Sequence, residues 1–480
     1  MIAKMNRLLL AAVLILVSMQ VGADAVERTS ADYKEPYQQQ ALAIYRQLIS
    51  YRSAAGHGKV PAVAEFLAEQ FRQGGFEARD VQVLPLQLPD GEQTASLVVR
   101  YRGDGSLGKK PVLLVAHMDV VDALPEDWER DPFTLIEEDG YFFGRGTLDD
   151  KFGITTLTSN FLRMRAAGYV PGRDFVIAFT GDEETGMLTT QSLVKEHRKL
   201  TDAEFALNAD GGGGQLSEAG QAMQFSVQTA EKTYASFELT VRNPGGHSSA
   251  PRKDNAIYQL GGALANIESH EFPVRVSDTT RRFFRNAAEQ TEGPVGAAMA
   301  QLAANPNDAQ AAAVLAEVPS LKGLTRTTCV ATMLRAGHAE NALPQSATAT
   351  VNCRIFPGES IESIAQTLEQ VSAQDGIEVV TLNDPVASPE SPVREDVIAA
   401  IRAGVERIHP GTPITPYMAA YGTDGMRIRP AGIPTYGVMS VFMRPENIFA
   451  HGLNERVPVR AFFDGLEFWN AVLLHLGKYR

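Results

Sequence analysis

The fold class is indicated first by residues 111–119, PVLLVAHMD. This stretch begins as a short continuous apolar run, which is typical of a strand buried on both faces of a sheet. Phe175 to Thr180 and Phe205 to Asn208 repeat this pattern, and Val60 to Phe71 has the spacing of an amphipathic helix. Such strands alternating with helix-period segments predict an α/β fold, with a mostly parallel sheet covered by helices on both faces.

A polar cluster follows each of the three apolar runs. His117 and Asp119 follow the first run. Asp182 to Glu184 follow the second, and Asp210 follows the third. Open α/β sheets place their ligand crevice at the carboxyl ends of parallel strands, where these clusters would meet. Adjacent carboxylates repel one another, so three in a row are either fully solvated or held together by cations.

Two of the motifs have plainer explanations when taken alone. His117 and Asp119, at positions i and i+2 of a strand, point to one side, so the carboxylate can hold a metal-bound imidazole; a solvated histidine at a strand end would look the same. Asp149 and Asp150, in FGRGTLDDKFG, precede a predicted helix and also fit N-capping. Hydrolysis by a metal pair needs a bridging carboxylate, imidazole or oxygen ligands and a free base, and the motifs together favour that chemistry.

A second pattern begins near Tyr234, where strict alternation predicts a strand with one buried face. The segments that follow give the order β-α-β-β-α-β, which is that of a ferredoxin-like unit. Its later strands are predicted at residues 325–335, 347–356 and 377–382, and its helices at residues 255–269 and 360–373.

The predicted domain boundaries follow from these patterns. An Ala-rich stretch at residues 281–318 is predicted to be helical, as a flap or an oligomer contact, and the proline-rich residues 383–392 predict a linker. We predict a catalytic domain in two parts, residues 24–232 and 385–480. A second domain is predicted to be inserted between them at residues 233–384.

The N-terminal residues have the pattern of a secretory signal. Lys4 and Arg7 precede an apolar run from Leu8 to Val17, and small residues follow at Ala23 and Ala25. A retained membrane anchor is the alternative, but the run has about ten residues where a span needs roughly 20. Residues 1–23 are therefore predicted to be a cleaved signal peptide, which implies a periplasmic or secreted protein with no membrane attachment afterwards.

Charge and cysteine content exclude several classes of protein. The formal net charge is −13, and removal of residues 1–23, which carry two positive charges and no negative ones, makes it −15. An acidic chain without a basic stripe is not expected to bind nucleic acid. Two cysteines exclude a disulfide scaffold and a cysteine-rich metal site. Cys329 and Cys353 lie in two β-like segments, where they either bridge in an oxidising compartment or stay buried free thiols.

In their order and spacing these motifs resemble the co-catalytic di-zinc metallopeptidase family. That family contains carboxypeptidase S, aminoacylase, carnosinase, glutamate carboxypeptidase and succinyl-diaminopimelate desuccinylase. The resemblance runs from about residue 40 to the C-terminus, and it implies that the inserted domain at residues 233–384 is a lid or dimerisation domain. The Ala-rich insert is similar to that of the carboxypeptidase S-like branch.

The resemblance implies two zinc ions, for which cobalt or manganese can substitute. One ion would be bound by His117, Asp149 and Asp210. The other would be bound by Asp149, Glu184 and His451, so that Asp149 is the bridge. Glu183 would be the general base that takes a proton from the attacking water and returns it to the leaving amine, and Asp119 would orient His117.

The resemblance also implies substrate-binding residues. Gly245 to Ser249, GGHSS, is similar to the loop whose histidine, here His247, comes from a partner subunit to stabilise the oxyanion, which implies a homodimer. Asn341 and Arg354 match residues that grip the substrate, an arginine fork being suited to a carboxylate. Without the resemblance, His247 is a loop histidine and Arg354 a surface charge. Tyr421 to Asp424, YGTD, is similar to a loop lining the substrate pocket, which makes Gly422 and Thr423 candidates.

The sequence thus predicts an exported metallo-carboxypeptidase or dipeptidase that cleaves an amide bond next to a free carboxylate. An N-acyl-amino-acid amidohydrolase is the alternative, since an acyl amino acid presents the same carboxylate to Arg354. The motifs leave both open. A non-catalytic metal-binding relative is a third possibility, against which the complete set of ligands and base argues.

Overall fold

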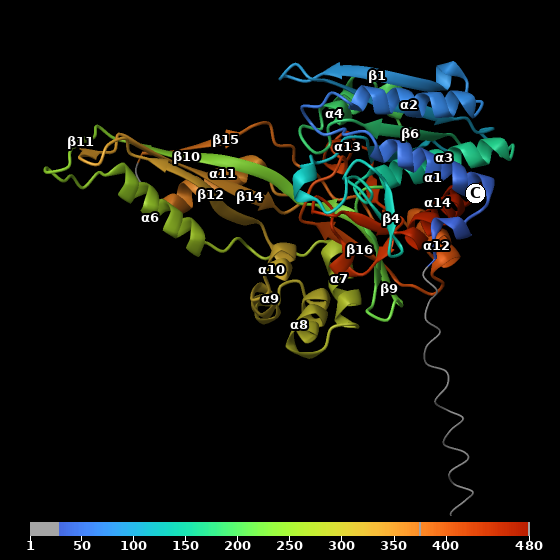
Figure 1. The fold of residues 1–480 in the computed structure, drawn as a ribbon. Coiled ribbons are helices and arrows are strands. Elements are labelled where there is room, and N and C mark those ends of the chain that lie inside the picture. The colour runs from blue at the N-terminus through green and yellow to red at the C-terminus, as the bar shows by residue number, and fades with distance from the viewer. Residues whose placement is uncertain (1–27, 374–375, 479–480) are drawn as a thin grey trace, which may run out of the picture.

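The computed structural model describes residues 28–373 and 376–478, and the predicted signal peptide lies outside them. The larger part of the molecule is built on a ten-stranded sheet in the order β1-β2-β6-β3-β7-β17-β9-β8-β18, with β16 paired to β9 (Figure 1). Its strands are β1 (Val81–Gln87), β2 (Gln93–Tyr101), β3 (Val112–His117), β6 (Phe175–Thr180), β7 (Phe205–Asn208), β8 (Gly213–Leu216), β9 (Ala222–Glu231), β16 (Ile414–Ala419), β17 (Thr435–Gly437) and β18 (Phe442–Met443).

The centre of this sheet is parallel and buried on both faces. β6, β3, β7 and β17 run parallel as neighbours, while β1 and β2 form an antiparallel edge. Leu114 and Ala116 of β3 join the core cluster on one face, and Leu113 and Val115 join the cluster on the other. This alternation explains why β3 is a continuous apolar run, and the predicted α/β fold with a mostly parallel sheet is confirmed.

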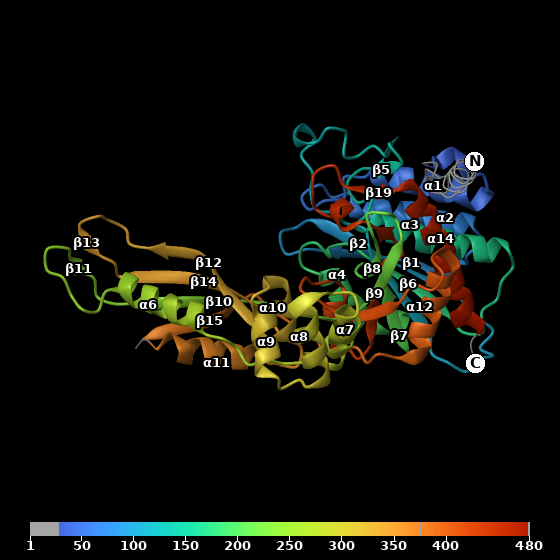
Figure 2. The ribbon, with the colours of Figure 1, turned by 90° about the horizontal axis from the view of Figure 1, so that it is seen from below.

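Helices cover both faces of the sheet, as Figures 1 and 2 show. The larger core cluster contains residues of α1 (Pro36–Ile49), α2 (Val60–Gln73), α3 (Lys151–Ala166), α12 (Glu395–Ile408) and α14 (Val459–Lys478). The cluster on the opposite face contains residues of α4 (Leu188–Lys195) and α13 (Gly425–Ile428), next to the short α5 (Arg198–Thr201). A small sheet of β4 (Ile136–Glu138), β5 (Tyr141–Phe143) and β19 (Arg456–Pro458) joins distant parts of the chain.

A second, antiparallel sheet is formed by residues between β9 and α12. Its four strands lie in the order β12-β14-β10-β15, which is the arrangement of a ferredoxin-like unit. They are β10 (Thr233–Arg242), β12 (Thr328–Ala336), β14 (Ser346–Ile355) and β15 (Ile377–Leu382), packed with α6 (Ala256–Ser269) and α11 (Ile361–Ser372). The short pair β11 (Gly246–His247) and β13 (Ala342–Leu343) lies at the end of this unit that is remote from the large sheet (Figures 1 and 2).

The Ala-rich stretch folds into a group of helices with a core of its own. They are α7 (Asp278–Ala288), α8 (Gly293–Ala304), α9 (Ala309–Ala316) and α10 (Pro319–Thr325). α7 packs against β16 of the large sheet, and Asn286 donates a hydrogen bond of 3.1 Å to Thr415 there. The helical character expected of residues 281–318 is therefore present.

The two cysteines form a disulfide between neighbouring strands. Cys329 of β12 and Cys353 of β14 are direct partners in the antiparallel register, with Cα atoms 4.1 Å apart. Of the two alternatives that the sequence left open, the structure has the bridge.

Among the helices formed by residues 28–373 and 376–478, none combines the length and the apolar character that a membrane span requires.

Candidate metal centre

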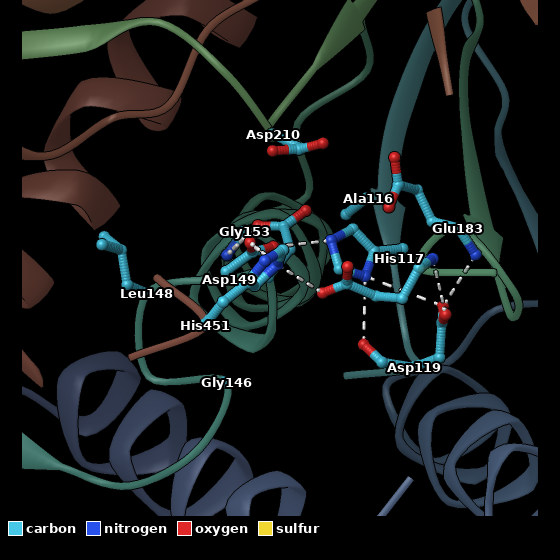
Figure 3. A network of polar contacts seen from close by, with 12 residues as sticks. Ala116, His117, Asp119, Gly146, Leu148, Asp149, Gly153, Glu183, Asp210 and His451 are labelled. Carbon is cyan, nitrogen blue, oxygen red and sulfur yellow. Dashed lines mark hydrogen bonds and ion pairs between the residues drawn. The ribbon is translucent and has the colours of Figure 1, made fainter. Parts of the chain in front are cut away.

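Three neighbouring strands bring the predicted polar clusters to one edge of the large sheet. His117 is the last residue of β3, Glu183 and Glu184 lie in the loop after β6, and Asp210 follows β7. Because β6, β3 and β7 are parallel neighbours, their carboxyl ends meet at the same place. Figure 3 shows His117, Glu183 and Asp210 facing a common centre.

Asp149 lies between two imidazoles. Its Oδ1 is 2.7 Å from Nε2 of His117, and its Oδ2 is 3.1 Å from Nε2 of His451. A carboxylate that bridges two cations presents one oxygen to each side in this way. The adjacent Asp150 instead caps α3, accepting a hydrogen bond from the N–H of Gly153 at 3.2 Å. The two acids that looked equivalent in the sequence therefore have different tasks.

His451 comes from the far end of the chain, in the loop that precedes β19. Its Nε2 is 3.0 Å from Oε1 of Glu184. Potential ligand atoms of His117, Asp149 and Glu184 all lie within 4.8 Å of one another. This group of imidazole nitrogens and carboxylate oxygens is a donor set that suits zinc and similar divalent metals.

Asp119 holds the site together through its backbone as well as its side chain. The Nδ1 atom of His117 lies 3.0 Å from the carbonyl oxygen of Asp119, whereas the nearest carboxylate oxygen is 3.7 Å away. The carboxylate accepts hydrogen bonds from the N–H groups of Glu183 and Glu184, at 3.1 and 3.0 Å (Figure 3). Asp119 thus orients the imidazole mainly with its carbonyl and fixes the glutamate pair with its carboxylate.

Glu183 is buried, with 8% of its surface exposed, and Figure 3 shows its carboxylate turned away from Asp119. Burial raises the pKa of Glu183 well above its usual value, His117 opposes this, and Asp210 and Asp424 add to it. A carboxyl group with a raised pKa holds a proton more readily at neutral pH, as a general base must during turnover.

The cluster also concentrates negative charge, which bound cations would neutralise. Four carboxylates, those of Asp149, Glu183, Glu184 and Asp210, line one cavity. Burial and the neighbouring Asp149 raise the pKa of Asp210 well above its usual value. Burial also raises the pKa of Asp149, but His117 and His451 outweigh it and hold that pKa well below the usual range. Two divalent cations would neutralise this crowding, so the residues present fit a metal pair.

A cavity of about 700 Å³ opens from the four carboxylates. One part of its wall is a row of glycines, Gly211 to Gly214, and another is formed by the hydroxyl-bearing rings of Tyr417 and Tyr421. The rest is mostly apolar and contains Leu148, Met439, Val441, Met443, Pro445, Ile448 and Ala450. The site therefore offers room for an extended apolar group beside the metal ligands.

Arg354, on β14, lies next to the loop that lines this cavity. Its Nη1 donates to the carbonyl of Ala420 at 3.0 Å, and its guanidinium carbon is 4.7 Å from the ring centre of Tyr234. Burial lowers the pKa of Arg354, and it forms no ion pair with a described carboxylate.

The two predicted residues of the neighbouring loop have different positions. Gly422 lines the cavity, whereas Thr423 is buried and donates to Glu231 from both its N–H and its hydroxyl. Thr423 thus anchors the loop to Glu231 and does not line the cavity.

His247 and Asn341 are not brought to the metal ligands of the same chain. Both are exposed and lie close together, because the N–H of Ser248, next to His247, donates to the carbonyl of Asn341 at 3.0 Å. The short strands β11 and β13, at this position, form the remote tip of the inserted unit (Figures 1 and 2). Within one chain, the predicted metal ligands and the base therefore lie together, and Arg354 lies beside the loop that lines the cavity, whereas His247 and Asn341 are far from them.

Two buried charged residues of the site were not predicted from the sequence. Arg145 and Glu455 form an ion pair of 2.7 Å in the loops that carry Asp149 and His451. Arg145 lies within the GRGTLDD motif and Glu455 follows His451 by four residues, so proximity to the motifs was the only available signal.

Comparisons with known proteins agree with this geometry. The sequence pattern of Peptidase family M20/M25/M40 matches residues 113–475. The N-fatty-acyl-amino acid synthase/hydrolase PM20D1 of Xenopus tropicalis is 30% identical over 359 residues, covering 73% of this chain and 69% of that protein. The probable carboxypeptidase S-like 2 of Dictyostelium discoideum is 26% identical over 394 residues, covering 80% of this chain and 75% of that protein.

A solved structure shares the whole fold. The metallo-carboxypeptidase Sso-CP2 of Sulfolobus solfataricus superposes with a TM-score of 0.65 at 18% identity, covering 91% of this chain and 99% of the other. The family match extends over most of the chain and includes every residue of the metal cluster. The chain is therefore an enzyme that belongs to Peptidase family M20/M25/M40.

Proposed function

We propose that this enzyme hydrolyses the amide bond of N-acyl amino acids, using two zinc ions held by His117, Asp149, Asp210, Glu184 and His451. The observation that carries the proposal is the position of Asp149 between two imidazoles, at the head of a largely apolar cavity. Cobalt or manganese would substitute for zinc, since the nitrogen and oxygen donors suit these ions too.

The chain's own residues supply the proton transfers. When bound, a pair of divalent cations polarises the scissile carbonyl and lowers the pKa of water. Glu183 takes the proton from the attacking water and delivers it to the leaving amine nitrogen. The carboxylate of Asp119 accepts a hydrogen bond from the backbone N–H of Glu183 and so keeps Glu183 in place, and the base does not need to reorganise between the two transfers.

Arg354 would bind the free carboxylate of the substrate. Its guanidinium is half-buried beside the cavity loop and has no described anionic partner, so a substrate carboxylate would satisfy it. A planar fork can bind both carboxylate oxygens, which fixes the amide next to the metal ligands.

The cavity wall favours an acyl group on the other side of the amide. A dipeptide would place a charged ammonium there, which requires an acidic partner. Apart from the four carboxylates of the metal cluster, the described residues that line the cavity include no acid. The apolar wall can bury a hydrocarbon chain at about 0.8 kcal/mol for each methylene group.

A carboxypeptidase or dipeptidase activity is the second candidate. The same Arg354 would hold the C-terminal carboxylate of a peptide, and one of the relatives is named carboxypeptidase S-like. A non-catalytic relative would be expected to lack a ligand or the base, and this chain has them all.

A substrate panel tests the first proposal against the second. Metal-loaded enzyme would be assayed with N-acyl amino acids of increasing chain length and with dipeptides that share the same C-terminal residue. We expect KM to fall as the acyl chain lengthens, and Glu183→Gln to lower kcat about 10²- to 10⁴-fold while metal analysis still finds two ions per chain. Preferred hydrolysis of dipeptides would favour the second candidate, and full activity of Glu183→Gln would remove the mechanism.

One pair of variants tests the apolar wall directly. Ile448 lines the cavity and is 60% exposed, and Val170, which is also 60% exposed, does not line it. Ile448→Asp should raise KM for long-chain substrates and not for short-chain ones, because it places a charge where the chain packs. Val170→Asp is the matched control and should change KM for neither group of substrates.

We also propose that the active form is a homodimer. His247 and Asn341 lie at the remote tip of the inserted unit, so in one chain they cannot reach its own substrate. β12 is an edge strand of its sheet and exposes Val330, Met333 and Leu334, which is a typical surface for pairing with a second copy.

Complementation tests the dimer. Glu183→Gln lacks the base and His247→Ala lacks the oxyanion donor, so each variant alone should be inactive. A mixture that has exchanged subunits should recover about a quarter of the wild-type rate, since half of the dimers contain one site with both residues. No recovery from a mixture with verified exchange would contradict the delivery of His247 between chains.

Export to the periplasm or the medium is a further proposal. It is supported by the signal-like N-terminal sequence and by the Cys329–Cys353 disulfide, since such bridges persist in oxidising compartments. Expression of the full chain, cell fractionation and N-terminal sequencing of the product test it. Recovery of an unprocessed cytoplasmic protein would refute it.

A further inference from the structure

The loops that carry Asp149 and His451 are joined by a buried ion pair. Arg145 is 3% exposed and Glu455 is fully buried, and Nη1 of Arg145 donates to Oε2 of Glu455 at 2.7 Å. Arg145 follows β5 and Glu455 precedes β19, and these two strands are antiparallel neighbours. The ion pair therefore lies at the end of the β5–β19 ladder that is nearest to the metal ligands.

The carboxylate of Glu455 organises the turn that ends at Asp149. Oε1 accepts the N–H groups of Leu148 at 2.7 Å and Asp149 at 3.1 Å. Oε2 accepts the N–H of Gly146 at 3.2 Å in addition to Arg145. An ionised carboxylate is an acceptor on both oxygens, so four donors satisfy it without water. The backbone of Asp149 is thereby tied directly to Glu455.

Arg145 also connects this turn to the loop that carries His451. Its Nη2 donates to the carbonyl of His451 at 3.2 Å, and the ring of Trp128 packs against its guanidinium. His451 has a φ of 63°, a left-handed backbone that residues with a Cβ seldom adopt. Such a conformation persists only where neighbouring contacts impose it, and the bond from Arg145 is one of these contacts.

An ordinary stabilising ion pair would lack these connections. Arg163 of α3 and Glu467 of α14 are also 2.7 Å apart and link distant segments, but their bonds reach no residue of the metal cluster. The Arg145–Glu455 pair differs because one partner holds the N–H of Asp149 and the other holds the carbonyl of His451.

We propose that Arg145 and Glu455 are positioning residues that set the separation of Asp149 and His451 and so prepare the metal site before any metal binds. The proposal rests on the proposed function only in requiring that this cluster binds metal. A charge alone would not suffice for the role, since Arg145 uses two nitrogens in different directions and Glu455 uses both oxygens.

Metal-binding measurements on paired variants test the proposal. Arg145→Lys keeps the charge and loses the second donor, and Glu455→Gln replaces an acceptor by a donor. Zinc affinity would be measured by chelator competition, and ligand geometry by the visible absorption of the cobalt-loaded protein. We expect both variants to lose about 10- to 100-fold in affinity at one of two sites and to change the cobalt spectrum.

Arg163→Lys and Glu467→Gln are the matched controls and should keep both the affinity and the spectrum, whatever their melting temperatures. Wild-type affinities and an unchanged cobalt spectrum in Arg145→Lys and Glu455→Gln would overturn the proposal. Failure of the proposed function would look different, because the wild-type chain itself would then bind fewer than two ions.

Hydrogen exchange on the wild-type chain gives an answer that does not depend on how the variants fold. If the ion pair prepares the site, the amides of Gly146, Leu148 and Asp149, which donate to Glu455, should be protected in both the metal-free and the metal-loaded protein. Protection that appears only after metal is added would show that the metal, and not the Arg145–Glu455 ion pair, positions the turn that ends at Asp149.

Discussion

The backbone N–H of Glu183 donates a hydrogen bond of 3.1 Å to Oδ1 of Asp119. The proposed base is thereby fixed by a residue two positions beyond His117, whose imidazole is itself held by the carbonyl of Asp119. One residue at the end of β3 thus places a metal ligand and the base relative to each other.

Asp119→Asn should therefore lower kcat about 10- to 100-fold and leave KM close to the wild-type value. The amide has one acceptor oxygen, so its NH₂ group would face the N–H of Glu183 or of Glu184 and push the glutamate pair out of line. Steady-state kinetics with saturating metal measure this. Asp80→Asn, which alters a buried aspartate paired with Arg102, is the control and should leave kcat unchanged. An unaltered kcat in Asp119→Asn would show that the hydrogen bonds do not position the base.

Arg354→Met should raise KM for substrates with a free carboxylate by roughly 10- to 100-fold, because a hydrogen-bonded charge pair contributes about 1.5 to 3 kcal/mol. The same substrates with an amidated carboxyl group should be hydrolysed equally poorly by the variant and the wild type. That equality separates a lost contact with the carboxylate from general damage to the site.

Arg242→Met, on the neighbouring strand β10, is the control for loss of a positive charge from the same sheet. A similar rise in KM for the control, or for amidated substrates, would mean that Arg354 does not bind the carboxylate.

The sequence could predict those parts of the site in which a polar residue directly follows a buried strand. The apolar run that ends at His117 must be a buried strand, and polar residues after three such runs must gather if the strands are parallel neighbours. His451 could be assigned only through the family resemblance, because no local pattern shows that a loop after β18 returns to β3.

Other features depend on contacts that the sequence does not encode locally. The chain has 57 acidic residues, and the sequence around Glu455 does not show that this one is fully buried and accepts the N–H groups of the turn before Asp149. The pairing of Cys329 with Cys353 depends on the register of β12 against β14, which a shift by one residue would abolish. The remote position of His247 depends on the orientation of the whole inserted unit.

Cys329→Ser with Cys353→Ser should destabilise the inserted unit and leave catalysis largely intact. The bridge closes a segment of 24 residues, and opening a loop of that length is expected to cost about 3 kcal/mol. Cys353 points into the core of the unit, while its neighbour Arg354 is on the other face of the strand. Thermal unfolding should therefore begin at a lower temperature, with KM near the wild-type value below the transition. A large rise in KM at low temperature would show that the bridge also positions Arg354.

Lys232 should make a contribution to the stability of the metal-free protein that grows as the pH rises above neutrality. This lysine is 1% exposed, and its Nζ donates to the carbonyl of Arg326 at 2.7 Å. Burial lowers its pKa from 10.5 to about 7, with Arg354 adding to the effect. Between these two pKa values the unfolded chain holds a proton that the folded chain has released, so raising the pH favours the folded state by up to about 1.4 kcal/mol per pH unit.

The variant Lys232→Met lacks this group. The difference in unfolding free energy between wild type and variant should therefore move in favour of the wild type from pH 7 to pH 10. Urea unfolding at several pH values measures the difference, in which the contribution of the other buried lysine, Lys151, cancels because both proteins contain it. Parallel pH curves for the two proteins would show that Lys232 keeps its proton on folding.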